Sequence, residues 1–200
     1  MRQQIEERTR FNIGRVKNLL QTYRDVRGVG GGRSSVHQTD ILRAGVVLLH
    51  ATLDDLLRSV ARWKWPTSSA EVLADIALVG MKQDVKKFSF KELAEHRHKS
   101  VAQVISESIE QCLDRSNWND TNEISRFLGT VDVLPGNVNQ SFPLLQELMQ
   151  RRHQIVHRAD RVDAQGQGNH RAAAINPELL GAWIGAVELF SADIMRELVD

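Results

Sequence analysis

The feature that most constrains the fold is the stretch TDILRAGVVLLHATLDDLLRSVARWKW at residues 39–65. Its aliphatic residues recur with helical spacing, and around its middle they cover much of the circumference of a helix. Thr39 or Asp40 can cap the start of this helix, and Pro66 prevents its further growth. A helix that is apolar on most sides needs neighbours around it, so we expect it to be the central and most buried element.

The other segments of the chain are also helical in pattern. No run of alternating apolar and polar residues has the length of a strand, and the chain has no internal repeat. We therefore predict an all-α fold, an irregular bundle of about six helices. We expect one domain over residues 1–200, with a helical elaboration at about 64–120 on a four-helix core. The predicted helices lie in 2–25, 39–65, 68–80, 90–116, the first part of 123–137, 141–160 and 176–199.

Charge, cysteine content and apolar runs argue against a strongly basic, disulfide-bonded, secreted or membrane-spanning protein. The formal net charge is +1, so no global field attracts nucleic acid, and a polyanion needs a local cluster of cations. Cys112 is the one cysteine, which cannot form an internal disulfide, and we expect it to be a small core residue. The charged start MRQQIEERTR is unlike a signal peptide, and no apolar run is long enough to span a bilayer. These observations predict a cytoplasmic protein without a membrane segment.

The glycine-rich stretch RGVGGGRSS at residues 27–35 does not match a phosphate-binding loop. A P-loop needs a glycine at position 27 and a lysine at position 33, and both positions hold arginine. A GxGxxG pattern that starts at Gly28 also meets Arg33 at its last position. We interpret the stretch as a flexible linker between two helices.

The histidines do not form a complete metal-binding pattern. His153 and His157 are four residues apart on one helix face, a spacing found among zinc ligands, whereas His96 and His98 lie elsewhere. The chain has no HExxH motif, and no acidic or cysteine partner has ligand spacing near these histidines. The flanking arginines also repel a divalent cation. We expect no metal site and no cofactor.

Polar residues interrupt the apolar stretch 39–65 at His50, Asp54 and Asp55. His50 and Asp54 are one helical turn apart and can bond to each other. One interpretation is a satisfied polar contact inside the bundle. The other is a supporting role in a functional site, in which an acidic group orients a catalytic residue across the core.

The stretch RRHQIVHRAD at residues 151–160 carries the strongest candidate chemistry. Arginine is a permanent cation that suits phosphate oxygens, and histidine can transfer a proton near neutral pH. Such groups can cleave RNA without a metal, because one takes the proton of the 2′-hydroxyl and the other stabilises or protonates the phosphate and the leaving oxygen. Arg152 and His157 are the candidate pair. The other interpretation is an ordinary helix end, where arginine and histidine bond to free carbonyl groups.

Helix geometry sets a condition on this pair. Five residues rotate a helix by about 500° and advance it by about 7.5 Å, so Arg152 and His157 point about 140° apart. The two side chains therefore do not share one face of one helix. They can converge on one substrate if a second copy of the helix packs against the first across a two-fold axis.

The same residues resemble a known family. Arg152, His153 and His157 match RxxxxH, the signature of HEPN domains, in which a polar residue follows the arginine. The stretch ILRAGVVLLHATLDDLLRSV resembles the earlier core helix of stand-alone HEPN proteins of the RiboL-PSP type. The resemblance implies an all-α bundle on a HEPN four-helix core, and a homodimer with a metal-independent endoribonuclease site in the dimer cleft. It implies that Arg152 contacts the scissile phosphate, that His157 acts in acid/base chemistry and that His153 assists. Family members often serve as toxins or in defence against phage.

The resemblance leaves a second function open, because some HEPN domains have lost catalysis and only bind RNA or nucleotides. A non-catalytic module would bind RNA, a nucleotide or a protein partner without cleavage. Its affinity for RNA would depend on salt through Arg151, Arg152, Arg158 and Arg161. For either function we expect Arg151 and Arg158 to contact the substrate, and an antitoxin or other regulatory protein is a further candidate partner.

Overall fold

The computed structural model describes residues 1–28, 35–161 and 172–198, which form eight α-helices and no β-strand. The prediction of an all-α fold is confirmed. An isolated bridge joins Arg161 to Ala172. The helices are α1 (Arg2–Arg27), α2 (Val36–Lys64), α3 (Ala70–Ala74), α4 (Phe90–Ala94), α5 (Val101–Arg115), α6 (Thr121–Gly129), α7 (Phe142–Arg158) and α8 (Pro177–Glu197), and three short 3₁₀ turns lie at Trp65–Thr67, Pro135–Asn137 and Asn139–Ser141.

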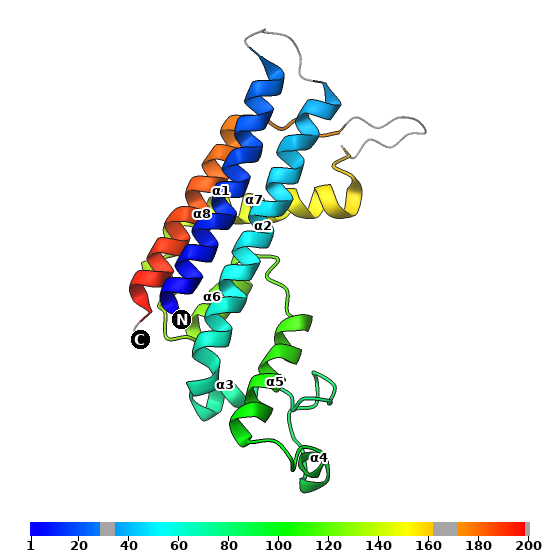
Figure 1. The fold of residues 1–200 in the computed structure, drawn as a ribbon, viewed down its shortest axis with the longest axis vertical. Coiled ribbons are helices and arrows are strands. Elements are labelled where there is room, and N and C mark those ends of the chain that lie inside the picture. The colour runs from blue at the N-terminus through cyan, green and yellow to red at the C-terminus, as the bar shows by residue number, and fades with distance from the viewer. Residues whose placement is uncertain (29–34, 162–171, 199–200) are drawn as a thin grey trace.

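Four long helices make the core. α1, α2 and α8 lie side by side along the long axis of the molecule, and α7 runs across them (Figure 1). α2 contacts the other three helices, and 13 of its residues are buried. Gly45 allows the close approach of α8, because a Cβ at this position would stand 2.8 Å from Cδ2 of Leu180. The central position of α2 follows from its nearly continuous apolar circumference.

The start of α2 differs from the prediction that Thr39 or Asp40 caps it. Ser35 is the cap, and it forms a capping box with Gln38. The Ser35 hydroxyl accepts a hydrogen bond from the N–H of Gln38 at 3.3 Å, and Oε1 of Gln38 accepts one from the N–H of Ser35 at 2.9 Å. This reciprocal pair satisfies two free N–H groups at once, so the helix begins one turn earlier than its apolar pattern indicates.

The prediction of one continuous helix over 90–116 is wrong. The chain forms α4 and α5 with turns between them. Ser100 begins the second helix, because its hydroxyl accepts a hydrogen bond from the N–H of Gln103 at 3.2 Å. Serine is favoured at the N-cap of a helix and disfavoured in the helix interior. The amphipathic spacing continues across the break, which is why periodicity alone does not reveal it.

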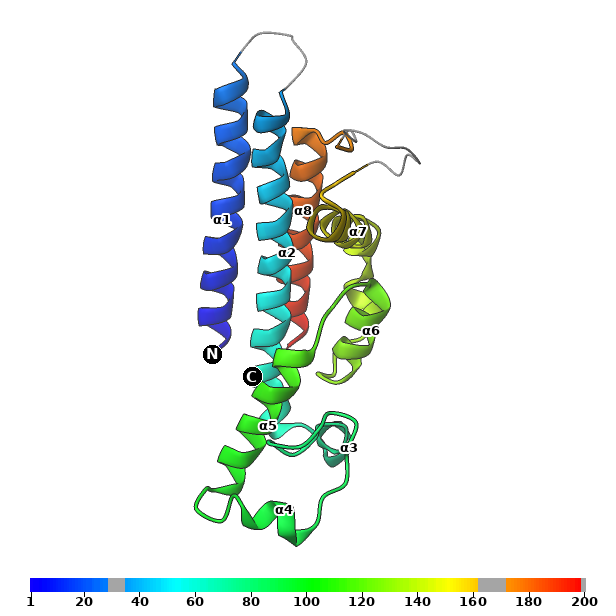
Figure 2. The ribbon, with the colours of Figure 1, turned by 90° about the vertical axis from the view of Figure 1, so that its right-hand side faces the viewer.

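The segment 64–120 lies largely beyond the four core helices. Figure 2 shows α3, α4 and α5 at one end of the molecule, away from α7. Aromatic side chains attach this end to the core: Trp65 and Trp118 each pack edge-on against Phe127, with ring centroids 5.9 and 5.5 Å apart. Cys112 on α5 is partly buried against the same core.

Two predicted connections lie mostly outside the described residues. Residues 29–34 of the glycine-rich stretch lie outside the described residues, so the linker interpretation stays a prediction. The same holds for residues 162–171 of the loop between α7 and α8. In the described part of the chain, no helix combines the length and apolarity that a bilayer crossing requires.

α7 ends in a left-handed turn that contains no glycine. Ala159 and Asp160 have φ angles of 49° and 56°. The N–H groups of Ala159 and Asp160 both donate to the carbonyl oxygen of Gln154, the second at 3.0 Å, which closes the end of the helix. Alanine disfavours this conformation because its Cβ lies too close to the next carbonyl oxygen. We expect Ala159→Gly to raise the free energy of unfolding by about 0.5–1 kcal/mol, as relief of strain exceeds the added chain entropy.

Urea denaturation measures this change. The control is Ala51→Gly, at an exposed position inside α2, which is expected to lower the free energy of unfolding by about 1 kcal/mol. A lower stability for Ala159→Gly as well would contradict the strain at the end of α7.

Candidate functional site

α7 carries most of the candidate site. Its buried residues, Leu145, Leu148 and Met149, pack toward α2 and α8. This packing follows from their helical spacing and leaves the last two turns of the helix at the edge of the core. Arg152 is half-buried there, whereas His153 and the following His157 are exposed.

A pocket of about 310 Å³ lies beside these turns. α2 contributes His50, and the connection between α5 and α6 contributes Asn119. Among the described residues of the lining there are two arginines and two histidines and no carboxylate, a composition that favours an anion. The residues from α7 are Met149, Gln150, Arg152, His153, Gln154 and Arg158.

His157 does not line this pocket. Its ring packs on that of His153, with centroids 4.6 Å apart and planes inclined by 45°. The two histidines are one turn apart on α7, as their spacing requires. One copy of the chain therefore brings Arg152 and His153 to the pocket and leaves His157 beyond its edge.

His50 reaches the pocket from the centre of α2. Its side chain is 8% exposed. Burial lowers the pKa of His50, and the positive charge of Arg152 lowers it further, against smaller opposing effects of Asp54 and of a hydrogen bond with the backbone of Trp118. The imidazole is therefore neutral at pH 7, which avoids placing a buried positive charge beside Arg152.

We expect an NMR titration to give His50 a pKa below 6.5, the ordinary value for histidine. As the pH falls, His50 is protonated at a higher pH in the unfolded chain than in the folded protein, which favours unfolding. The contribution of His50 to stability is therefore complete above about pH 6.5 and declines as the pH falls toward the lowered pKa. His50→Gln identifies the resonance and removes this part of the pH dependence. A measured pKa of 6.5 or higher would contradict the described burial.

Arg151, which we expected at the substrate, lies in a buried ion-pair network instead of the pocket. Its Nη2 donates to Oδ2 of Asp160 at 2.8 Å and to the carbonyl oxygens of Ala173 and Ala174 at 3.0 and 3.1 Å. Burial lowers the pKa of Arg151, with a further lowering by Arg43 and an opposing effect of Asp160. The side chain thus joins the end of α7 to the segment that leads into α8.

Arg43 and Asp160 complete this network, and sequence reasoning did not identify either of them. Nε of Arg43 donates to Oδ2 of Asp160 at 2.7 Å, and its Nη2 donates to the carbonyl oxygen of Ala173 at 2.9 Å. Asp160 is 1% exposed and Arg43 is 9% exposed. Arg43 could have been identified from its position, because it is a charged residue on the apolar side of α2 and a buried charge requires a partner. The network fixes the end of α7, and with it the last turns that carry the candidate residues.

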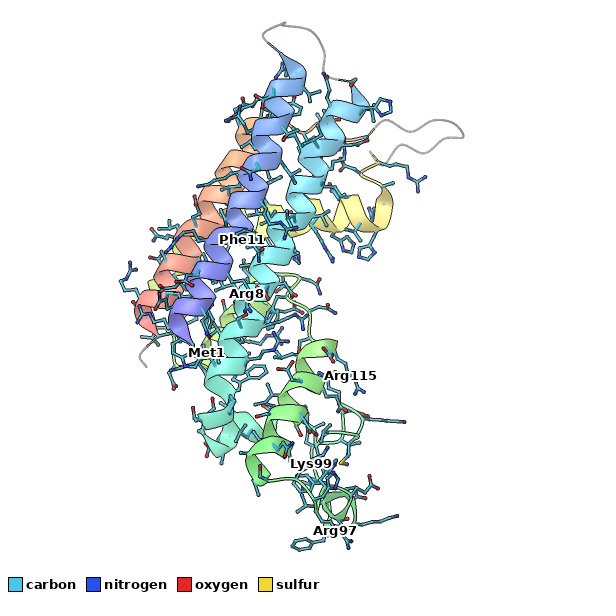
Figure 3. All side chains as sticks on the ribbon, viewed as in Figure 1. Met1, Arg8, Phe11, Arg97, Lys99 and Arg115 are labelled. Atoms are coloured by element: carbon cyan, nitrogen blue, oxygen red, sulfur yellow. The ribbon has the colours of Figure 1, made fainter. Side chains whose placement is uncertain are left out.

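Asp54 and Asp55 pair away from the pocket. Asp54 accepts a hydrogen bond from Nε of Arg58 at 2.6 Å. Asp55 pairs with Arg8 of α1, labelled in Figure 3, at 3.0 Å. Asp54 therefore pairs with Arg58 and not with His50, as the spacing of His50 and Asp54 would have allowed, although Asp54 still acts on His50 through its charge.

The Asp54–Arg58 pair supports the pocket indirectly. Nη2 of Arg58 donates to the carbonyl oxygen of Ser116 at 2.8 Å, and its guanidinium lies 5.4 Å from the ring centroid of Trp118. These contacts hold the chain that follows α5 against α2. Asn119, the next residue, is thereby held at the pocket wall.

The remaining candidates lie near the same helix end. Arg158 lines the pocket, whereas Arg161 is exposed beyond it and donates from Nε to the carbonyl oxygen of Arg158 at 3.2 Å. Within residues 1–28, 35–161 and 172–198, no three His, Cys, Asp or Glu side chains are grouped closely enough to hold a metal ion.

The fold and the site define an all-α protein with a basic, histidine-containing pocket at the end of a core helix. The chain belongs to the RiboL-PSP-HEPN family, whose family model matches residues 11–199. The predicted membership of the HEPN superfamily is thus confirmed, and the match also runs through the segment 64–120. No curated protein and no solved structure matches the chain.

Proposed function

We propose that this protein is a metal-independent endoribonuclease that acts as a homodimer, in the role of a toxin or an effector of phage defence. The observation that carries the proposal is the pocket in which Arg152 lies with His153, Arg158 and the neutral His50, and whose described lining residues include no carboxylate. A phosphodiester is an anion that this lining can bind. It is also the group that the RxxxxH residues of an active HEPN protein would cleave.

In the proposed reaction, Arg152 binds the non-bridging oxygens of the scissile phosphate and stabilises the charge of the transition state. The 2′-hydroxyl of the preceding ribose loses its proton and its oxygen attacks the phosphorus, and the bond to the 5′-oxygen breaks. His157 either takes the proton of the attacking hydroxyl or donates a proton to the leaving 5′-oxygen, and water accepts or supplies the other proton. His153, packed on the His157 ring, orients it. The products are a 2′,3′-cyclic phosphate and a 5′-hydroxyl.

A second copy of α7 completes the proposed site. His157 lies outside the pocket of its own chain, and Val156 beside it is 47% exposed. A two-fold axis next to the exposed turn brings His157 of each copy toward the pocket of the other. In this arrangement Arg152 and His157 of one site come from different chains.

Incubation of the purified protein with RNA in EDTA tests the activity. We expect cleavage that continues in excess chelator and leaves 2′,3′-cyclic phosphate ends, identified by mass spectrometry. Products with 3′-hydroxyl ends, or activity that stops with the chelator, would refute the proposed reaction.

The second candidate function is binding without cleavage. The position of His157 outside the pocket favours it, since one copy alone offers an anion-binding lining without the complete acid/base pair. RNA binding whose affinity falls steeply with salt, without any cleavage by the dimer, would identify this function.

A further inference from the structure

An apolar groove of about 480 Å³ lies in the segment 64–120, far from the end of α7. Aliphatic side chains of α3, α4 and α5 line it, among them Leu73, Leu93 and Ile105. The groove shares no lining residue with the α7 pocket. It is therefore a separate feature that the proposed cleavage does not use.

Exposed apolar side chains extend the groove onto the surface. Phe88 and Val101 line it and are 52% and 77% exposed. Phe90, on the adjacent α4, is 88% exposed. Exposed apolar surface of this kind, next to a groove, marks a site of association.

The charge around the groove selects the partner. The described residues of the lining include Arg97 and Lys99 and no carboxylate. Residues 81–99 carry six Lys or Arg residues against three Asp or Glu residues. Lys99 pairs with Glu107 at 2.6 Å, whereas Arg97 has no ion pair among the described residues. An acidic ligand complements this rim.

We propose that the groove binds an acidic amphipathic helix of a protein partner. Apolar anchors at positions i, i+3, i+4 and i+7 of such a helix fit an aliphatic groove, and acidic residues along its flanks meet the basic rim. RNA fits less well, because bases stack on aromatic faces, and Phe88 is the one aromatic residue among the described groove-lining side chains apart from the His96 imidazole. The segment 64–120 is therefore a docking lobe, independent of the α7 site.

The test uses the full chain and two synthetic helical peptides. Both peptides have leucine at i, i+3, i+4 and i+7, and they differ only in carrying Glu or Lys at the flanking positions. Fluorescence anisotropy measures their affinities. We expect saturable binding of the Glu peptide and at least about tenfold weaker binding of the Lys peptide.

Two surface variants locate the binding site without threatening the fold. We expect Phe88→Ala and Arg97→Glu each to weaken the binding of the Glu peptide by about fivefold or more. The matched controls are Phe11→Ala on α1, which is 69% exposed, and Arg115→Glu at the end of α5, and neither is expected to change the affinity. Figure 3 shows Arg97 at the end of the molecule, with Phe11 and Arg115 away from it.

Three results would overturn the proposal. The first is the absence of saturable binding by the Glu peptide up to about 1 mM. The second is equal affinity for the two peptides. The third is an affinity for single-stranded RNA that Phe88→Ala removes, because the groove would then be a nucleic-acid site.

Discussion

Asp160→Ala is expected to lower the free energy of unfolding by about 3–5 kcal/mol, the usual cost of removing one partner of a buried ion pair. The Asp160 carboxylate is 1% exposed and lies between two arginines, with Oδ2 at 2.7 Å from Nε of Arg43 and 2.8 Å from Nη2 of Arg151. Its removal leaves two guanidinium groups close together without a buried counter-charge. Urea denaturation followed by tryptophan fluorescence measures the loss.

Two control variants separate charge from conformation. Asp160→Asn keeps the size of the side chain and its tolerance of the left-handed backbone, so a loss of similar size assigns the effect to charge. Asp40→Ala removes the other carboxylate that pairs with Arg43, at 3.1 Å, but Asp40 is largely exposed. We expect it to cost no more than about 1 kcal/mol. If Asp160→Ala were as mild as Asp40→Ala, the network would not stabilise the end of α7.

If the protein cleaves RNA as proposed, Arg152→Ala is expected to lower kcat/KM by at least about 100-fold, because in that reaction Arg152 is the cation that meets the transition-state charge. His157→Ala is expected to lower it by about 10²–10⁴-fold through loss of proton transfer. Arg152→Lys keeps the charge but loses the bidentate geometry, so it is expected to restore part of the activity. The control is Arg126→Ala, at an exposed position on α6 outside the pocket.

Mixing the two inactive variants tests whether the site is shared. In a heterodimer of Arg152→Ala and His157→Ala chains, one of the two sites combines the intact arginine of one chain with the intact histidine of the other. We therefore expect refolding equal amounts of the two variants together to recover about a quarter of the wild-type activity, because random pairing makes about half of the dimers heterodimers and each of these has one intact site of two. A site within a single chain predicts no recovery. Retention of full activity by either variant alone would instead refute its assigned role.

The spacing of apolar residues and the capping residues predicted the helices that depend on interactions between neighbours in the sequence. The helical spacing of aliphatic residues predicted the all-α fold and the buried, central α2. Asn176 and Pro177 mark the start of α8, where Oδ1 of Asn176 accepts a hydrogen bond from the N–H of Leu179 at 2.7 Å. The break between α4 and α5 was missed, because a single serine cap decides it while the amphipathic spacing runs on.

The sequence by itself determined which side chains α7 carries and that Arg152 and His157 lie on different sides of it, because helix geometry depends only on spacing. Only the tertiary structure decided what those side chains meet. It placed both Arg151 and Arg43 on Asp160, although Arg43 and Asp160 are separated by 117 positions in the chain. It also placed His50 beside Arg152. No local pattern specifies such contacts, since distant helices meet only when the core packs, and a buried charge such as that of Asp160 then requires partners from those helices.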